Sequence, residues 1–225
     1  GRCVFFTLNP ARYHMLKIQY TVFLADDIVL ASHGISFNIV SEGMCLRVEV
    51  PMRGKHSVYN ALSAYVMAFS MGISQSAIVE GLRQVVPAPG RMSQVISKPD
   101  NVLIDDTYNA NPASFKAAID TLKQSQLPTY LVMGDMGELS TNTATYHSEI
   151  GQYAKDHNID WLLCIGDNSI HAMHAFGKRG MHFESKEALL DTLYNHLGPQ
   201  WTILVKGSRF MRMETIVQAI QEKKL

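Results

Sequence analysis

A polar segment in the second half of the chain could bind a charged or hydroxyl-bearing ligand. Segment 105–112 opens with Asp105 and Asp106, directly after the apolar residues Leu103 and Ile104. A carboxylate at the end of a buried strand needs a partner, a hydroxyl donor or a metal, because an isolated buried charge is strongly unfavourable. A ribose, an ammonium group or a cation would each meet this need.

A second segment of this kind lies near the C-terminus. Segment 206–209 combines two cations, Lys206 and Arg209, with the hydroxyl group of Ser208, and it also follows an apolar run. Backbone N–H groups point outward where a strand leads into a helix. The segment therefore suits a carboxylate or a phosphate.

Two further polar turns follow apolar runs. Segment 134–139 is a glycine-spaced acidic turn that contains Asp135, whereas segment 166–169 is typical of ordinary helix capping. Asn111 and Pro112 are likewise typical of the first residues of a helix, because asparagine caps free N–H groups and proline suits the first turn.

The first half of the chain and the region after it contribute one candidate each. Asn60 lies one turn into a predicted helix, where its amide could pair with a base edge or bond only a neighbouring carbonyl. Arg91 follows the proline-containing segment 85–90, and an arginine beside a domain linker is suited to bind a phosphate when domains approach. Most surface arginines are merely solvated, so neither residue decides the function alone.

Several nucleotide and metal motifs are absent from the sequence. It contains no G-x-x-x-x-G-K-[ST] loop, no G-x-G-x-x-G after a strand, no G-x-S-x-G and no H-E-x-x-H. His171 and His174 have the i, i+3 spacing of a helix, but no third ligand is in register with them. We therefore expect no metal site and no conventional nucleotide-phosphate loop in this chain.

The elements that must position these residues alternate between strand and helix after residue 86. Short, nearly all-apolar runs at 102–104, 130–133, 161–165 and 203–205 alternate with helical patterns at 112–123, 143–157, 168–176, 185–197 and 212–221. Such runs are typical of strands that are buried on both faces of a parallel sheet. The order predicts a doubly wound α/β domain, in which ligands bind beyond the carboxyl ends of the strands.

The residues before this domain follow a different pattern. Alternating segments 35–40 and 45–50 predict an antiparallel hairpin, and two helical patterns follow it. Segment 85–90 cannot continue a helix or a central strand, so we place a domain boundary there. The predicted domains are 1–86 and 87–225.

The composition excludes several classes of function. The formal net charge is zero and no basic tract follows a nucleic-acid backbone, so nucleic acid is not an expected partner. No apolar run approaches the roughly 18 residues of a membrane span, and the first residues lack the layout of a signal peptide. The three cysteines have no metal-ligand spacing, so we expect reduced thiols in a cytoplasmic protein without membrane insertion. A start without methionine is typical of a piece of a longer chain or of a processed protein.

Five segments, taken together and in this order, resemble the Mur ligases. They are 54–62, 89–91, 103–112, 132–139 and 203–209. The resemblance is greatest to members that join D-alanyl-D-alanine to UDP-N-acetylmuramoyl-tripeptide, and it is nearly continuous from about Ala31 to the C-terminus. It implies a C-terminal Rossmann-like doubly wound domain, preceded by the tail of a central ATPase domain with antiparallel strands and helices.

The resemblance also implies a reaction. In the family, ATP phosphorylates the tripeptide carboxylate, and the amine of D-alanyl-D-alanine attacks the acyl phosphate while Mg²⁺ neutralises the phosphates. The phosphate loop and the magnesium ligands would lie before Gly1, so we expect this chain to be inactive alone. UDP-N-acetylmuramoyl-tripeptide and D-alanyl-D-alanine are the implied partners, and a monomer is the expected state.

By resemblance, the candidate residues divide into two groups. The residues implied to bind ATP are Asn60 at adenine, Arg91 at the γ-phosphate, Asp106 at the ribose hydroxyls, and Tyr108, Asn109 and Asn111 in the same cleft. The residues implied to face the dipeptide or the transferring group are Asp135, Lys206, Ser208 and Arg209. Arg91 and Lys206 are the implied catalytic residues. Ser57 departs from the family pattern, which often has asparagine there, so adenine binding would rest on fewer side-chain amides.

Two other functions fit the same residues. The second domain could be a Rossmann-like module that binds a small ligand without chemistry. Alternatively, the chain could belong to a Mur-type ligase with another amino substrate such as glutamate, although segments 105–112 and 134–139 resemble those of the dipeptide-specific members.

Overall fold

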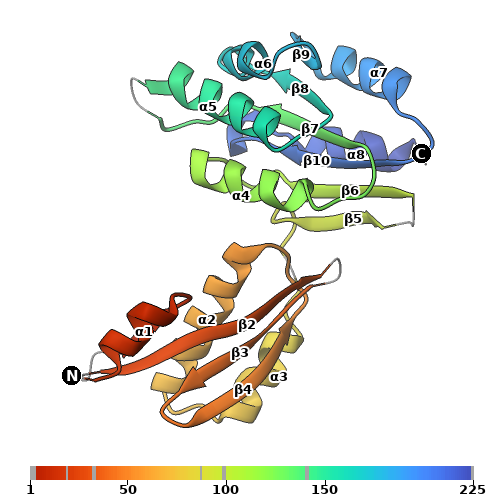
Figure 1. Ribbon diagram of the computed structural model, residues 1–225. Coiled ribbons are helices and arrows are strands. Elements are labelled where there is room, and N and C mark those ends of the chain that lie inside the picture. Colours follow the sequence, from red (N-terminus) through yellow and green to blue (C-terminus); the bar gives the residue numbers. More distant parts are fainter. Residues whose placement is uncertain are drawn as a thin grey trace. The chain divides into compact units, whose positions relative to one another are not determined.

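Two units make up the chain, each built around one β-sheet (Figure 1). The computed structural model describes residues 4–18, 20–31, 34–86, 88–97, 100–139 and 142–223. The units are Gly1–Pro87 and Ala88–Leu225. None of the described helices has the length and hydropathy that a bilayer crossing requires.

Within its described residues, the first unit has a four-stranded sheet with helices on both faces. Its elements are β1 (Val4–Thr7), α1 (Pro10–Leu16), β2 (Thr21–Ala31), β3 (Gly34–Ser41), β4 (Met44–Val50), α2 (Lys55–Ser70) and α3 (Gln75–Arg83). The strand order is β1-β2-β3-β4, and β1 is parallel to β2 whereas the other neighbours are antiparallel. Side chains alternate along β2, so Val22 and Leu24 pack with Tyr13 of α1 while Phe23 and Ala25 face α2 and α3.

Within its described residues, the second unit has a six-stranded sheet. Its elements are β5 (Ser93–Ser97), β6 (Asn101–Asp106), α4 (Pro112–Leu122), β7 (Thr129–Gly134), α5 (Thr143–Asp156), β8 (Trp161–Ile165), α6 (Ile170–Phe176), β9 (Gly180–Phe183), α7 (Lys186–His196), β10 (Trp201–Lys206), η2 (Arg209–Met211) and α8 (Glu214–Glu222). The order is β5-β6-β10-β7-β8-β9, with β5 antiparallel to β6 and the remaining neighbours parallel. Strands β7 and β10 are buried along their whole length, as their apolar runs predict.

Helices cover both faces of this second sheet, as in a doubly wound fold. Helices α4, α5 and α6 pack on the face that carries Ile104 and Leu131, and α7 and α8 pack on the face that carries Leu103 and Val205 (Figure 1). The chain changes face between β9 and β10, and β10 then enters between β6 and β7. The predicted α/β class and the doubly wound architecture are confirmed.

The predicted helices of the second unit match α4 to α8 within two residues at each end, and the predicted hairpin of the first unit is β3 and β4. The sequence patterns do not predict β1, α1, β5 or β9. Strands β1, β5 and β9 have only 4 or 5 residues and lie at sheet edges, where partial exposure weakens the apolar pattern. The assignment of residues 1–86 to a central ATP-binding domain stays a prediction.

Helices α5 and α6 approach each other closely at Gly151. A Cβ atom added to Gly151 would collide with the carbonyl oxygen of Ala172 in α6. A backbone oxygen cannot turn away as the end of a flexible side chain can, so this packing requires glycine.

We expect Gly151→Ala to destabilise the second unit by about 1–3 kcal/mol, the usual cost of overpacking a core. Urea denaturation followed by tryptophan fluorescence measures this effect, because both tryptophans, Trp161 and Trp201, lie in the second unit. Gly198→Ala is the matched control, since Gly198 lies in the same unit and an added Cβ there meets nothing within 4 Å. An equal tryptophan midpoint for the two variants would contradict the close-packing argument.

Candidate active site

The carboxyl ends of β6, β10 and β7 lie side by side, because β10 is inserted between the other two strands. The chain leaves β6 and β7 for helices on one face of the sheet, and it leaves β10 for α8 on the other face. In doubly wound folds, ligands bind where successive loops diverge in this way. Segments 105–112, 134–139 and 206–209 all start at this edge.

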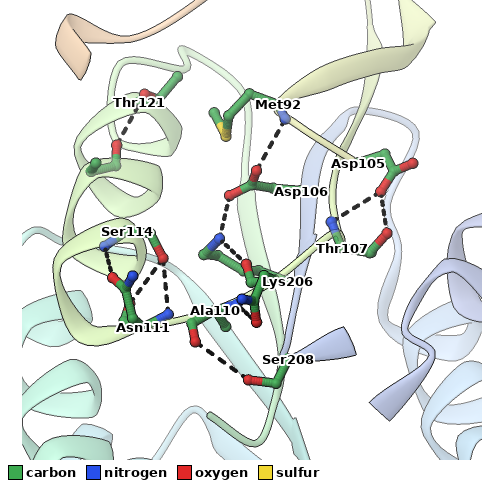
Figure 2. Close-up of polar contacts among 12 residues, drawn as sticks. Met92, Asp105, Asp106, Thr107, Ala110, Asn111, Ser114, Thr121, Lys206 and Ser208 are labelled. Atoms are coloured by element: carbon green, nitrogen blue, oxygen red, sulfur yellow. Dashed lines mark hydrogen bonds and ion pairs between the residues drawn. The ribbon is translucent and has the colours of Figure 1, made fainter. Parts of the chain in front are cut away.

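Asp106 and Lys206 form a buried ion pair at this edge (Figure 2). The register pairs these residues across neighbouring parallel strands, so their side chains point to the same face of the sheet. Lys206 Nζ lies 2.7 Å from Asp106 Oδ2 and donates to the carbonyl oxygen of Asn109 at 2.9 Å. Asp106 Oδ1 accepts the N–H of Met92 at 3.0 Å. The partner that the sequence requires for Asp106 is therefore an ammonium group of the same chain. The side chain of Lys206 is only 2% exposed and that of Asp106 only 13% exposed.

Asp105 points to the opposite face of the sheet and is bonded by its own loop (Figure 2). Its Oδ1 atom accepts the N–H of Thr107 at 3.1 Å and the hydroxyl group of Thr107 at 2.6 Å. The hydroxyl donor that the sequence requires for Asp105 is therefore two residues away. Asp105 shapes the start of the loop.

Asn109 and Asn111 shape the rest of the loop into α4. Asn109 Oδ1 accepts the N–H of Ala110 at 2.8 Å. Asn111 Oδ1 accepts the N–H of Ser114 at 2.8 Å, and the N–H of Asn111 donates to Ser114 Oγ at 3.0 Å. This reciprocal pair is a capping box, so the interpretation of Asn111 as a helix cap is confirmed.

Ser208 joins three loops through its hydroxyl group and its backbone, and Figure 2 shows its contact with Ala110. Ser208 Oγ accepts the N–H of Gly137 at 2.7 Å and donates to the carbonyl oxygen of Ala110 at 3.3 Å. The N–H of Ser208 donates to the carbonyl oxygen of Asp135 at 2.9 Å. The buried side chain thus holds segments 105–112, 134–139 and 206–209 together.

The carboxylate of Asp135 is turned toward the start of α6. Its Oδ1 atom accepts the N–H of Ser169 at 2.7 Å, and its Oδ2 atom accepts the N–H and the Nδ2 group of Asn168, both at 3.1 Å. Ser169 is the N-cap residue of α6, but its side chain makes no capping bond. The interpretation of segment 166–169 as ordinary capping is therefore wrong for this side chain. Instead, the backbone N–H groups of Asn168 and Ser169 bind the negatively charged carboxylate of Asp135.

His147 is a buried member of the same network, and the sequence reasoning did not single it out. Its Nε2 atom accepts the N–H of Met136 at 3.0 Å, and its Nδ1 atom bonds the carbonyl oxygen of Thr143 at 2.7 Å. Burial lowers the pKa of His147, whereas the bond to Thr143 and the nearby carboxylate of Asp135 raise it less. The helical pattern could have indicated that His147 is buried, because His147 falls on the same helical face as buried Ile150 and Ala154.

Arg91 and Tyr108 form an exposed pair at the entry to this region. The guanidinium carbon of Arg91 lies 4.0 Å from the centroid of the Tyr108 ring, a cation–π arrangement. The N–H of Tyr108 donates to the carbonyl oxygen of Gly90 at 2.9 Å. Gly90 has a φ of +74°, and an added Cβ would lie 2.8 Å from the backbone nitrogen of Tyr108. Both side chains of the pair remain exposed to solvent and can therefore contact a ligand.

The remaining candidates lie apart from the buried network. Arg209 is exposed and its NH1 atom lies 3.6 Å from Glu214 Oε1. Asn60 is exposed on α2 of the first unit. In the described part of the chain, no three His, Cys, Asp or Glu side chains are grouped to hold a metal ion. The structure therefore brings Asp106, Lys206 and Ser208 together and leaves Asn60 in a separate unit.

Comparisons with known proteins identify similar chains. Residues 90–209 match the family described as "Mur ligase, glutamate ligase domain". The chain is 38% identical over 204 residues to UDP-N-acetylmuramoyl-tripeptide–D-alanyl-D-alanine ligase of Escherichia coli, a match that covers 89% of this chain and 44% of that protein. The ligase of the same name from Haemophilus influenzae is 35% identical over 205 residues, covering 88% and 44%.

Solved structures agree with these sequence matches. A crystal structure of MurF from Acinetobacter baumannii has a TM-score of 0.86 and 29% identity, covering 99% of this chain and 52% of that chain. The chain thus spans about half the length of the relatives it matches.

We expect Lys206→Met to destabilise the second unit by about 3–5 kcal/mol, because it leaves the Asp106 carboxylate buried without its cation. The double variant Asp106→Asn with Lys206→Met should lose less stability than Lys206→Met alone. Urea denaturation followed by tryptophan fluorescence measures both variants.

Lys123→Met is the matched control for this pair. Lys123 Nζ lies 2.7 Å from Asp120 Oδ1, the same distance as in the buried pair, but these side chains are 37% and 45% exposed. An exposed pair contributes about 0–1 kcal/mol, so this variant should change stability little. Equal losses for Lys123→Met and Lys206→Met would show that burial is not the cause.

Proposed function

Because the chain belongs to the Mur ligase family, we propose that it is the C-terminal part of an enzyme that joins D-alanyl-D-alanine to UDP-N-acetylmuramoyl-tripeptide with consumption of ATP. The observation that carries this proposal is the 38% identity over 89% of the chain to a ligase of that name. The resemblance extends through all three loops that Ser208 joins, since the family match covers residues 90–209.

The proposed reaction has two steps. The γ-phosphoryl group of ATP passes to a carboxylate oxygen of the tripeptide, which gives an acyl phosphate and ADP. The amine nitrogen of D-alanyl-D-alanine then attacks the acyl carbon, a C–N bond forms, and the C–O bond to phosphate breaks. The amine loses a proton and inorganic phosphate leaves, so the products are an amide, ADP and phosphate. Positioning and charge stabilisation supply most of the catalysis in such a reaction. Because ATP and a UDP-linked precursor are its substrates, we place the reaction in the cytoplasm.

The exposed candidates are the ones that we assign to direct ligand contact. Arg91 offers a guanidinium group for the γ-phosphate, and the carbon of that group lies 4.0 Å from the centroid of the Tyr108 ring. Asn109 has an exposed side chain beside them, and Arg209 has one on the loop after β10. Asn60 is assigned to adenine by resemblance alone.

The buried candidates are better suited to hold the loops than to touch the substrate. Both oxygens of Asp106 already accept bonds from this chain, so a ribose hydroxyl would use its remaining lone pairs. Lys206 and Ser208 are almost completely buried, and the Asp135 carboxylate accepts bonds from Asn168 and Ser169. We therefore assign Lys206, Ser208 and Asp135 to positioning, whereas Asn111 caps α4.

Magnesium is the metal that the family implies, and it would neutralise the ATP phosphates. The described residues offer no group of three carboxylate, histidine or cysteine ligands for it. We assign its ligands and the phosphate loop to the part of the relatives that this chain does not span, and we assign no step of this chain to the metal.

Release of ADP by the complete protein tests the proposal. We expect release that requires both UDP-N-acetylmuramoyl-tripeptide and D-alanyl-D-alanine, and none from the 225-residue chain alone. Glutamate in place of D-alanyl-D-alanine distinguishes a Mur-type ligase with another amino substrate. ADP release with glutamate but not with the dipeptide would overturn D-alanyl-D-alanine as the proposed amino substrate. ADP release by the isolated chain would overturn its assignment as an incomplete part of the enzyme.

We expect Arg91→Met to lower kcat/KM for ATP roughly ten- to a hundredfold in the complete protein. The loss corresponds to a charged hydrogen bond of about 1.5–3 kcal/mol. Arg179→Met is the matched control, because Arg179 is an exposed arginine that pairs with Asp160 just before β8, at the opposite edge of the sheet. Unchanged kinetics in the Arg91 variant would remove the phosphate role.

A further inference from the structure

His147 holds the loop after β7 by accepting a backbone hydrogen bond. The N–H of Met136 can only donate, so Nε2 of His147, at 3.0 Å, carries no proton. Nδ1 then carries the proton and donates it to the carbonyl oxygen of Thr143 at 2.7 Å. The imidazole is completely buried, and both of its nitrogens are used. Only the neutral ring with the proton on Nδ1 satisfies this geometry.

The loop that His147 holds contacts the segments beyond two other strands, β8 and β10. Asp135, next to Met136, bonds Asn168 and Ser169 beyond β8. Gly137, on the other side of Met136, donates to the hydroxyl group of Ser208 beyond β10. Met136 therefore sits between the two anchors, and its own N–H is fixed by α5.

We propose that His147 is a positioning residue for the amino-substrate side of the reaction. By holding the N–H of Met136, it fixes segment 134–139 against Ser208 and so sets the loop edge that receives the incoming amine. This role rests on the proposed ligase function, whereas the hold on the loop is a property of the chain itself.

The hydrogen bond from the N–H of Met136 to His147 should weaken at low pH. A second proton on the ring would occupy Nε2 and face the N–H of Met136, donor against donor. Burial lowers the pKa of His147 from its ordinary 6.5, Asp135 beyond β7 opposes this shift, and His171 on α6 adds to it. Since the folded-state pKa is depressed, the stabilisation is present above about pH 6.5 and is lost as the pH falls through the folded-state value.

Three variants of the complete protein test the proposal. His147→Phe removes the acceptor, and His147→Gln replaces it, because an amide oxygen can accept the N–H of Met136. His157→Phe is the matched control, since Nδ1 of His157 bonds the carbonyl oxygen of Tyr153 four residues earlier, as in His147, but its ring is partly exposed at the end of α5. The readouts are amide hydrogen-exchange protection of residues 134–139 and separate KM values for D-alanyl-D-alanine and ATP.

We expect His147→Phe to lower the protection of residues 134–139 at least tenfold and to raise KM for D-alanyl-D-alanine about tenfold, with KM for ATP within twofold. His147→Gln should recover most of both losses, and His157→Phe should show neither. In the wild type, protection corrected for intrinsic exchange should be constant above about pH 6.5 and should fall as the pH is lowered from there through the folded-state pKa of His147. It should stay constant in His147→Gln, which keeps the test available if the phenylalanine variant does not fold.

Unchanged protection in His147→Phe, or an equal fall with pH in His147→Gln, would overturn the hold on the loop. Loss of protection with unchanged KM for D-alanyl-D-alanine would overturn the role in substrate positioning. Absence of any dipeptide ligation by the wild type would instead reject the proposed function, and hydrogen exchange would still decide whether His147 holds the loop.

Discussion

The second unit depends on a buried charge, the ammonium group of Lys206. Removing such a group from water costs several kcal/mol unless partners replace the lost hydration. Asp106 and the carbonyl oxygen of Asn109 are those partners, and both belong to the neighbouring strand β6 and its loop. A slip of one residue between β6 and β10 would turn Lys206 to the opposite face, away from Asp106. This contact therefore favours the observed register of β6 and β10 and ties the loop after β6 to β10.

The carboxylate of Asp135 meets the same requirement in another way. It is bonded by N–H groups of Asn168 and Ser169 and by a side-chain amide. Gly166 makes this approach possible, since its φ is +118° and an added Cβ would lie 2.5 Å from the Asp135 carboxylate carbon. Dipoles fixed in the backbone thus stabilise one buried charge, whereas a salt bridge stabilises the other.

Much of this arrangement could be predicted from local sequence, and some of it could not. The need of Asp105 and Asp106 for partners follows from two carboxylates after an apolar run, and the structure supplies Thr107 and Lys206. The partner of Asp106 could not be predicted from local sequence, because Lys206 is 100 residues away along the chain. The two residues meet only because β10 lies beside β6 in the sheet. His147 was missed for a related reason, since its acceptor role appears only when α5 packs beside the loop after β7. The roles of Arg91 and Asn60 toward ATP stay predictions.

Insertion of β10 between β6 and β7 has a consequence for synthesis on the ribosome. Chains emerge from the N-terminus onward, so β6, β7, β8 and β9 are all made before the strand that joins the first two. Until Trp201–Lys206 leaves the exit tunnel, β6 and β7 have unpaired edges and Asp106 has no cation. The sheet centre closes last, through contacts of high sequence separation that form slowly. The nascent second unit therefore passes through a stage in which the facing edges of β6 and β7 are open to chaperones and to aggregation.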